Sequence, residues 1–231
     1  MKTINLRILG VDEAGRGCVI GPLVVAGVLI DERNEPKLLE LGVKDSKLLS
    51  RRRREFLAKE IKKVAIDTYI IKLSPAEIDE AVNSQRKLHK LNRLEAQTMA
   101  KVIETLRPDI AFVDASDILA NRYKQHIVEC LPFQVQVISE HKADKKYPVV
   151  SAASIIAKVE RDRKIDELKA QHGDFGSGYM ANPETMAFLE TLIKKYGAYP
   201  DFVRRSWKPA KIAKTNVKMK QTQLHEEMTK A

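Results

Sequence analysis

Four acidic residues follow predicted strands in a pattern that suits a cation site. Asp12 and Glu13 come directly after the apolar run Leu6–Val11, and Asp114 comes directly after another apolar run. Asp144 lies between the last predicted strand and a helix. Ligands of open α/β sheets collect at strand ends, so these elements can bring several acids to one place. Clustered carboxylates repel one another and take up protons unless a cation neutralises them, so the pattern predicts a bound cation.

The all-oxygen ligand set determines which cation is expected. Carboxylates select hard ions, so we expect Mg²⁺ or Mn²⁺ rather than zinc. Two such ions, roughly 3.5–4 Å apart, can hold the attacking and the leaving oxygen of a phosphodiester. The alternative for each acid taken alone is a surface residue or a helix cap.

A glycine-flanked arginine follows the first pair of acids. Neighbouring residues of a regular strand face opposite sides, so Asp12 and Glu13 can face one ion only if the backbone bends there. Glycines on either side of Arg16 make such a bend easier. The turn Gly15-Arg16-Gly17 can also bring N–H groups close to a ligand, and its arginine can bind phosphate with two hydrogen bonds. Taken alone, the motif is equally typical of an ordinary hairpin turn.

Two further segments offer possible contacts to phosphate. Asp45-Ser46-Lys47 supplies a hydroxyl and an ammonium group in a loop before a basic helix, and it is equally compatible with a capped turn. Arg51–Arg54 opens that helix, where the helix dipole disfavours positive charge. Contact with a phosphate backbone would explain this arrangement, and so would a solvated helix face.

Composition limits the classes of protein to consider. The chain has 231 residues, of which 44% are hydrophobic and 31% charged, so it is long enough for one large or two small folded domains. Lys and Arg number 41 against 31 Asp and Glu, and the net charge of +10 favours polyanionic partners such as nucleic acid. The two cysteines are too few for a disulfide framework or a four-thiolate zinc site.

No segment is predicted to cross a membrane or to direct secretion. The longest apolar stretch, Cys18–Ile30, is interrupted by glycine and proline and is too short to span a bilayer. The first residues are not followed by a long apolar region of the kind found in signal peptides. We therefore expect a cytoplasmic protein with no membrane partner.

Apolar periodicity alternates between strand-like and helix-like segments, which predicts an α/β fold with a mixed sheet. Five strands are expected, the first two as a hairpin: Leu6–Val11, Pro22–Ile30, Asp67–Leu73, Ile110–Val113 and Gln134–Ile138. Helices are expected at Arg51–Val64 after a Ser50 cap, after the capping box Ser74-Pro75-Ala76-Glu77, and at Asp117–Cys130, Val149–Gln171 and Pro183–Tyr196. A long helix ending before Pro108 carries a mostly apolar stripe of Leu88, Leu91, Glu95, Thr98, Val102 and Leu106.

In combination, these segments resemble one family, the type 2 ribonucleases H or ribonucleases HII, in their archaeal branch. The resemblance covers about residues 6–208 and follows the family's order of motifs. The matching segments are Gly10–Gly17, Val19–Leu23, Asp45-Ser46-Lys47, Val113-Asp114, His141–Ile155, Gly176–Tyr179 and Arg205-Ser206-Trp207.

The resemblance implies both a fold and an activity. The implied fold is ribonuclease H-like, with a mixed five-stranded sheet flanked by helices and a helical C-terminal extension. The implied reaction is endonucleolytic cleavage of RNA in RNA–DNA hybrids, and nicking on the 5′ side of single ribonucleotides embedded in duplex DNA. Water attacks the phosphorus and leaves 3′-hydroxyl and 5′-phosphate ends, in a reaction that needs Mg²⁺ or Mn²⁺, with two ions expected during catalysis.

The resemblance also implies roles for individual residues. The family's catalytic, metal-binding carboxylates match Asp12, Glu13, Asp114 and Asp144. The residues that match its substrate-binding positions are Gly15, Arg16, Gly17, Ser46, Lys47 and Tyr179. The backbone of the glycine-flanked turn would read the 2′-hydroxyl, and the tyrosine would pack against the neighbouring deoxyribose. Without the resemblance, Tyr179 is better interpreted as a core or hinge tyrosine.

One position of this chain departs from the family pattern. Many members carry proline where this chain has Cys18, which we expect to be buried and inert.

We expect a monomer with one catalytic domain over residues 1–208, including a helical region at about 165–208. A basic tail over 209–231 would be a loosely attached helix or disordered. Gln221-Thr222-Gln223-Leu224 resembles the start of a sliding-clamp peptide, but Glu227 and Met228 occupy its aromatic positions.

Two other functions remain open from the sequence. The first is a ribonuclease HIII-like enzyme that needs runs of ribonucleotides, although that family usually carries an extra N-terminal domain. The second is a nucleic-acid-binding module without catalysis, which would gain nothing from four acids that repel phosphate.

Overall fold

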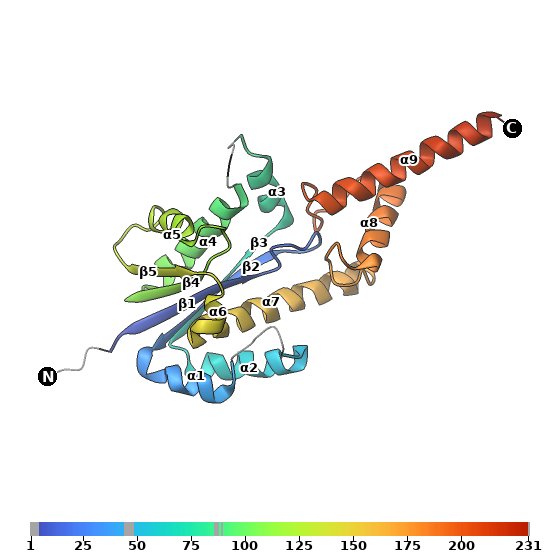
Figure 1. Ribbon diagram of the computed structural model, residues 1–231. Helices are drawn as coiled ribbons and strands as arrows, with labels where there is room; N and C mark the ends of the chain where they lie inside the picture. Colours follow the sequence, from blue (N-terminus) through green and yellow to red (C-terminus); the bar gives the residue numbers. More distant parts are fainter. Residues whose placement is uncertain (1–4, 44–48, 86–87, 89, 231) are drawn as a thin grey trace. The chain divides into compact units, whose positions relative to one another are not determined.

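The computed structural model of the chain describes residues 5–43, 49–85, 88 and 90–230 (Figure 1). The chain divides into two compact units that interleave in sequence. Unit 1 comprises Met1–Arg16, Leu23–Lys72 and Arg86–Asp162. Unit 2 comprises Gly17–Pro22, Leu73–Gln85 and Arg163–Ala231.

Unit 1 is built on one five-stranded mixed sheet, as predicted. Its strands lie in the order β3-β2-β1-β4-β5, so β1 is central. β1 pairs antiparallel with β2 as the predicted hairpin and parallel with β4, which in turn pairs parallel with β5. The strands are β1 (Arg7–Ala14), β2 (Leu23–Asp31), β3 (Asp67–Leu73), β4 (Ile110–Asp114) and β5 (Gln136–Glu140).

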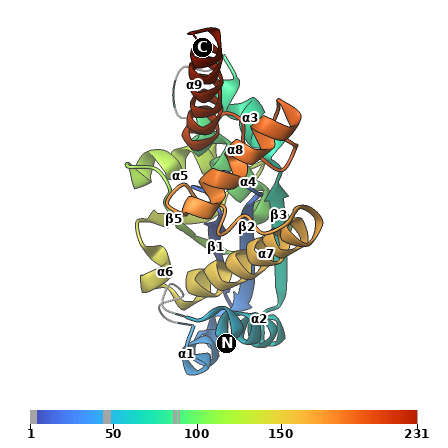
Figure 2. The ribbon, with the colours of Figure 1, turned by 90° about the vertical axis from the view of Figure 1, so that its right-hand side faces the viewer.

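Helices cover both faces of this sheet (Figures 1 and 2). One face packs against α2 (Arg51–Val64) and the first part of α7 (Pro148–His172). The other packs against α4 (Lys90–Leu106) and α5 (Ala120–Val128). Because side chains alternate along a strand, the even-numbered residues of β1 face α7 and the odd-numbered ones face α4.

Helix caps account for several boundaries that were predicted correctly. The Ser50 hydroxyl accepts the N–H of Arg53 at 3.3 Å, and α2 begins at Arg51. Ser74 and Glu77 form a complete capping box at the start of α3 (Pro75–Asn83). Three short elements were not predicted because they are too short to show apolar periodicity: η1 (Glu32–Asn34), α1 (Glu35–Leu41) and α6 (Ala143–Lys146).

Unit 2 is mainly helical, which confirms the expected helical C-terminal region. It contains α3, the end of α7, α8 (Pro183–Tyr196) and α9 (Lys208–Lys230). Its core joins Val19 and Ile20 to apolar residues of the three last helices. Cys18 is fully buried, as expected, and accepts a hydrogen bond from the buried guanidinium of Arg204 at 3.2 Å.

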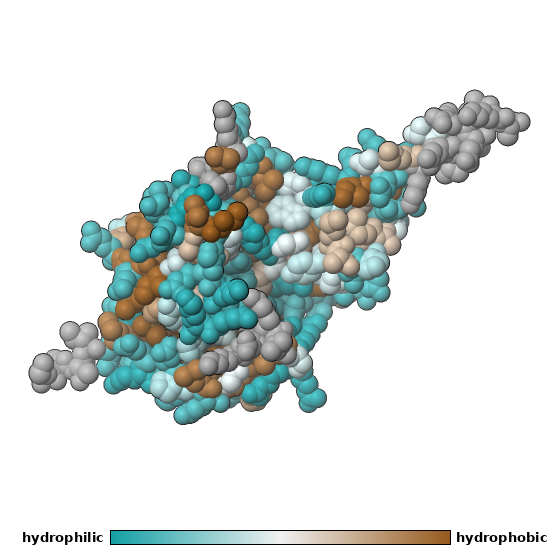
Figure 3. All heavy atoms as spheres, in the orientation of Figure 1, coloured by the Kyte–Doolittle hydropathy of each residue, from teal (hydrophilic) through white to brown (hydrophobic). Residues whose placement is uncertain are grey.

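The face shown in Figure 3 is mainly hydrophilic, and its hydrophobic side chains lie in small separate patches. Among the described residues, no helix has both the length and the apolar character needed to span a membrane.

Candidate active site

Three carboxylates of unit 1 meet where its parallel strands end. Val11 of β1 pairs with Val113 of β4, so the residues that follow, Asp12 and Asp114, lie side by side. Asp144 reaches them from α6, and each of the three acids offers an oxygen within 4.8 Å of the others. Asp12 and Asp144 are each only 5% exposed. The structure thus brings together three of the four acids that the sequence indicated.

An unusual backbone conformation places Asp144. Lys142, just before α6, has a φ of 58°, in the left-handed region that residues other than glycine rarely adopt. The resulting turn directs the N–H of Ala143 to Asp114 Oδ1, at 2.9 Å. The same turn brings Asp144, one residue later, to the other two acids. Strain of this kind, about 1–3 kcal/mol, persists only where the surrounding structure enforces it.

Glu13 lies on the opposite side of β1 from the three-carboxylate group. The strand stays regular through Ala14, with Glu13 paired to Val25, so the bend that would let both acids face one ion is not present. The chain turns only afterwards, at Gly15, where φ is 84°. Glu13 Oε1 accepts the Ser116 hydroxyl at 2.6 Å, whereas Oε2 is buried and accepts no hydrogen bond from the described residues.

Burial and the charges of neighbouring acids disfavour the ionised forms of Asp12 and Glu13. Burial, followed by the charges of Glu13 and Asp114, raises the pKa of Asp12 well above its usual value, although a hydrogen bond from Ser154 opposes this. Burial and then the charge of Glu95 raise the pKa of Glu13 to about 8, despite the hydrogen bond from Ser116. The converging carboxylate oxygens, and the buried Glu13 Oε2 that accepts no hydrogen bond from the described residues, are therefore the atoms to which a hard divalent cation would bind.

The raised pKa of Glu13 predicts how the stability of the fold depends on pH and on bound metal. Its folded pKa of about 8 lies above the usual 4.5, so folding takes up a proton between these values. In chelator, this contribution to stability is complete below pH 4.5 and is lost as pH rises through 8. If Mn²⁺ binds the ionised acids of the folded state, as the site predicts, it should raise Tm at pH 8 by several degrees. Thermal unfolding at pH 5 and pH 8, with chelator or Mn²⁺, measures both effects. Equal Tm values with and without Mn²⁺ at pH 8 would contradict the site.

The side chain of Arg16 donates hydrogen bonds to two residues of α4. Its Nε donates to the Glu95 carboxylate, with Oε1 at 2.8 Å and Oε2 at 3.1 Å. Its Nη2 donates to Asn92 Oδ1 at 2.8 Å. Nε and Nη2 of Arg16 are therefore held within the protein, while its contact with phosphate stays a prediction.

Tyr179 lies beside Gly17 within unit 2. A Cβ on Gly17 would stand 3.7 Å from the tyrosine ring, and the neighbouring Gly178 carbonyl accepts the N–H of Val19 at 2.8 Å. The tyrosine is 36% exposed, so it is not a core residue. Ser46 and Lys47 lie outside the described residues.

The arginine cluster at the start of α2 makes contacts within the protein. Arg51 pairs with Glu55 at 3.1 Å, and Arg53 donates to the Leu41 carbonyl at 3.0 Å. Arg54 pairs with Asp162 of α7 at 3.0 Å. Three of the four arginines thus have partners within the protein.

Sequence reasoning missed the polar residues that surround the acids. Glu95 stood out only as an acid within an apolar stripe, and it is fully buried. Ser116 and Asp117 lie within three residues of Asp114, a proximity that could have marked them. The others gave no signal that could be separated from ordinary helix positions: Asn92, Arg122, Tyr123 and Ser154.

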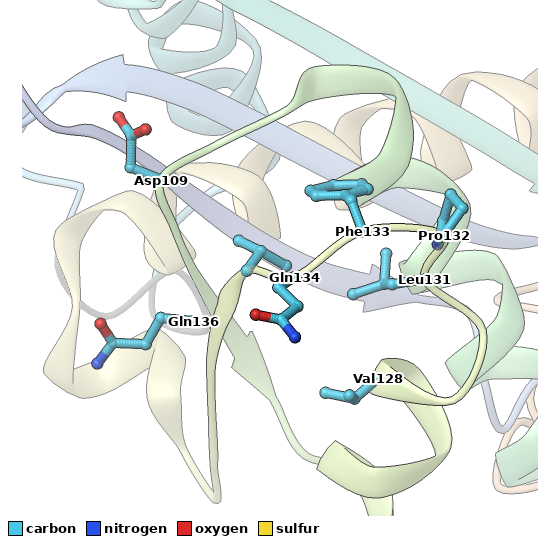
Figure 4. A pocket seen from close by; sticks show the side chains of 8 residues that line it. Asp109, Val128, Leu131, Pro132, Phe133, Gln134 and Gln136 are labelled. Carbon is cyan, nitrogen blue, oxygen red and sulfur yellow. The ribbon is translucent and has the colours of Figure 1, made fainter.

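A separate hollow of about 750 Å³ lies at the opposite end of the strands (Figure 4). It is lined by Asp109, which precedes β4, by Gln136, which begins β5, and by the loop between α5 and β5. Asp109 already accepts the backbone N–H of Arg7 at 2.7 Å. Because none of the clustered acids lines this hollow, it is not part of the candidate site.

Comparisons with known proteins agree with this geometry. A family model for ribonuclease HII matches residues 9–210. Ribonuclease HII of Pyrococcus furiosus is 45% identical over 95% of this chain and 96% of its own. The crystal structure of ribonuclease H2 from Pyrococcus horikoshii OT3 is 44% identical, with a TM-score of 0.85 over 92% of this chain and 99% of that one. Ribonuclease HII of Archaeoglobus fulgidus, solved in complex with PCNA, is 47% identical, with a TM-score of 0.79 over 88% and 96%. The expected ribonuclease H-like fold is thereby confirmed, and the chain belongs to the ribonuclease HII family.

Proposed function

We propose that this endoribonuclease, besides the metal-dependent cleavage of RNA in RNA–DNA hybrids that its family implies, nicks duplex DNA on the 5′ side of a single embedded ribonucleotide. The products would carry 3′-hydroxyl and 5′-phosphate ends. The observation that carries the proposal is the convergence of Asp12, Asp114 and Asp144 within 4.8 Å in a chain of this family.

The carboxylates would hold Mg²⁺ or Mn²⁺. When bound, the ions supply charge neutralisation at the phosphate and lower the pKa of water to make a nucleophile. The chain's own part is to fix the ligands: the Ala143 N–H orients Asp114, and Ser116 orients Glu13. Because Glu13 lies across β1 from the other acids, an arrangement with two ions suits the four carboxylates better than one ion does.

The ribonucleotide would be recognised by backbone and ring. In this proposal, the Gly15-Arg16-Gly17 backbone contacts the 2′-hydroxyl, which distinguishes RNA from DNA at a given site. Tyr179 would pack against the deoxyribose of the next nucleotide, where a 2′-hydroxyl would clash. The anchoring of the Arg16 side chain by α4 and the exposed ring beside Gly17 both support these roles.

A nicking assay tests the proposal directly. The substrate is a DNA duplex with one ribonucleotide, incubated with Mg²⁺, Mn²⁺ or chelator, alongside an all-DNA duplex and a long RNA–DNA hybrid. We expect a metal-dependent nick 5′ of the ribonucleotide and none in the all-DNA duplex. Cleavage of the hybrid alone would instead support the ribonuclease HIII-like alternative, and binding without any cleavage would support the non-catalytic one.

Replacing Tyr179 by alanine tests junction recognition. We expect kcat/KM on the single-ribonucleotide duplex to fall roughly tenfold more than on a long hybrid, because packing against one deoxyribose is lost. Tyr179→Phe keeps the ring and serves as the control that retains the preference. Equal losses on the two substrates would rule out the junction-reading role.

Monomer state and clamp binding are separate proposals. We propose that the chain acts as a monomer, which light scattering after gel filtration tests against its mass of 26.2 kDa.

The Archaeoglobus fulgidus relative was solved with PCNA, so a sliding clamp is a second candidate partner. In this chain only Gln221 and Leu224 match the expected peptide, and their replacement by alanine should weaken any clamp binding seen in a titration.

A further inference from the structure

A fully buried acid, Glu95, anchors the turn that follows β1. It lies on the apolar face of α4 with no exposed surface, and it forms an ion pair with Arg16 at 2.8 Å. A buried carboxylate is costly unless it is paired and hydrogen-bonded, so this contact is a specific feature rather than a chance surface pair. The same acid interrupts the apolar stripe in the sequence.

A second arm holds the same arginine from one helical turn away. Asn92 accepts Arg16 Nη2 at 2.8 Å, and its amide nitrogen donates to Asp117 Oδ2, also at 2.8 Å. An amide that accepts on one side and donates on the other has only one satisfactory orientation. Asn92 therefore presents its oxygen to Arg16 because Asp117 holds its nitrogen.

Asp117 is itself fixed in place. It is 1% exposed and accepts hydrogen bonds from Arg122 Nε at 3.0 Å, from Arg122 Nη2, and from the Leu119 N–H at 3.0 Å. Burial opposes ionisation, but these donors together with Asn92 hold the pKa of Asp117 well below its usual value. The network thus joins the turn after β1, helix α4, the loop after β4 and helix α5.

The network pairs its own charges, and it reaches the turn through one side chain, that of Arg16. Two arginines face two carboxylates, and the guanidinium of Arg16 donates to two acceptors of α4. Gly15 and Gly17 have no side chains, and Gly15 is in the left-handed region with a φ of 84°. Arg16 is therefore the one residue through which side-chain contacts can constrain the turn.

We propose that Glu95 and Asn92 are positioning residues that hold the Gly15-Arg16-Gly17 backbone in the conformation that selects a ribonucleotide over a deoxyribonucleotide. The inference rests on the proposed function, in which this backbone contacts the 2′-hydroxyl. It separates selection from hydrolysis: the network sets how strongly the ribonucleotide is preferred, whereas the carboxylates carry out the reaction.

Two variants of the full chain test the network. Asn92→Ala removes one arm and leaves the Arg16–Glu95 pair intact, so it should fold even if the buried change Glu95→Gln does not. The matched control is Glu160→Gln, which breaks the Lys72–Glu160 pair of unit 1, at 3.0 Å, a pair that shares no residue with the network. Each variant is assayed for nicking of a single-ribonucleotide duplex, with an all-DNA duplex as competitive inhibitor, and its Tm is recorded.

The expected result is a loss of discrimination. KM for the ribonucleotide duplex should rise about tenfold in Asn92→Ala, while the inhibition constant of the all-DNA duplex and kcat stay within about twofold. Glu160→Gln should match the wild type. If the wild type itself prefers neither duplex, the proposed function fails. If the wild type discriminates and Asn92→Ala discriminates equally well, or loses only kcat, the positioning role is overturned.

Discussion

Asp114→Asn is expected to lower kcat on an RNA–DNA hybrid by about three powers of ten or more, while the Kd for the hybrid changes only severalfold. The substitution keeps the shape and an oxygen that can still accept the Ala143 N–H, so α6 should stay in place. It removes one negative charge from the group formed with Asp12 and Asp144. Metal-assisted charge stabilisation is worth several kcal/mol, and each 1.4 kcal/mol corresponds to a tenfold change in rate.

Single-turnover cleavage reports the loss of rate, and binding of the hybrid measured in Ca²⁺ reports the Kd. Asp109→Asn is the matched control, because it makes the same change just before the other end of the same strand, where Asp109 accepts the Arg7 N–H. We expect this control to cleave at the wild-type rate. A loss of binding as large as the loss of rate would count against a purely catalytic role for Asp114.

Gly10→Ala is expected to destabilise unit 1 by several kcal/mol, a large part of the roughly 5–15 kcal/mol typical of folded proteins. A Cβ at Gly10 would lie 2.2 Å from the Val149 carbonyl oxygen and 2.5 Å from the Val150 nitrogen. Both are backbone atoms at the start of α7, and no side-chain rotation can move them away. Either α7 or β1, the strand that carries Asp12, would have to shift.

Urea unfolding of the two variants Gly10→Ala and Gly27→Ala provides the comparison. At Gly27, on the neighbouring strand β2, an added Cβ would lie 2.4 Å from Val102 Cγ1 and 3.0 Å from Leu106 Cδ1, which are side-chain rather than backbone atoms. Valine in a helix is stiff, so Gly27→Ala also costs stability, but side chains can take up part of the strain and the loss should be smaller. A free energy of unfolding for Gly10→Ala within about 1 kcal/mol of wild type would refute the close backbone approach.

Local signals explain which parts of the fold could be predicted from the sequence. Ser50, Ser74 and the apolar periodicity after them located α2 and α3, because caps act within a few residues. The hairpin of β1 and β2 was equally local. The rule that ligands gather at strand ends then brought Asp12 and Asp114 together correctly, although the parallel pairing behind it spans distant segments.

The parts that could not be predicted depend on tertiary partners. Glu95 fitted a helix face that is otherwise apolar, and only the position of Arg16 shows why an acid is tolerated there. A lysine such as Lys142 gives no sequence signal for a left-handed conformation, so the short helix that delivers Asp144 was missed. The division into two units was not visible either, because unit 2 takes residues 17–22 and 73–85 from the first half of the chain.

The parallel pairing of β1 with β4 also decides when, during folding, the carboxylate group can exist. β1 and β2 are joined locally, whereas β1 and β4 are separated along the chain by β2, β3 and helices α1 to α4. Pairings between distant segments form late, because the long intervening loop must close first. Asp12 and Asp114 therefore meet and begin to repel only when most of unit 1 is assembled. A cation that relieves this repulsion acts after that step, so it slows unfolding more than it accelerates folding.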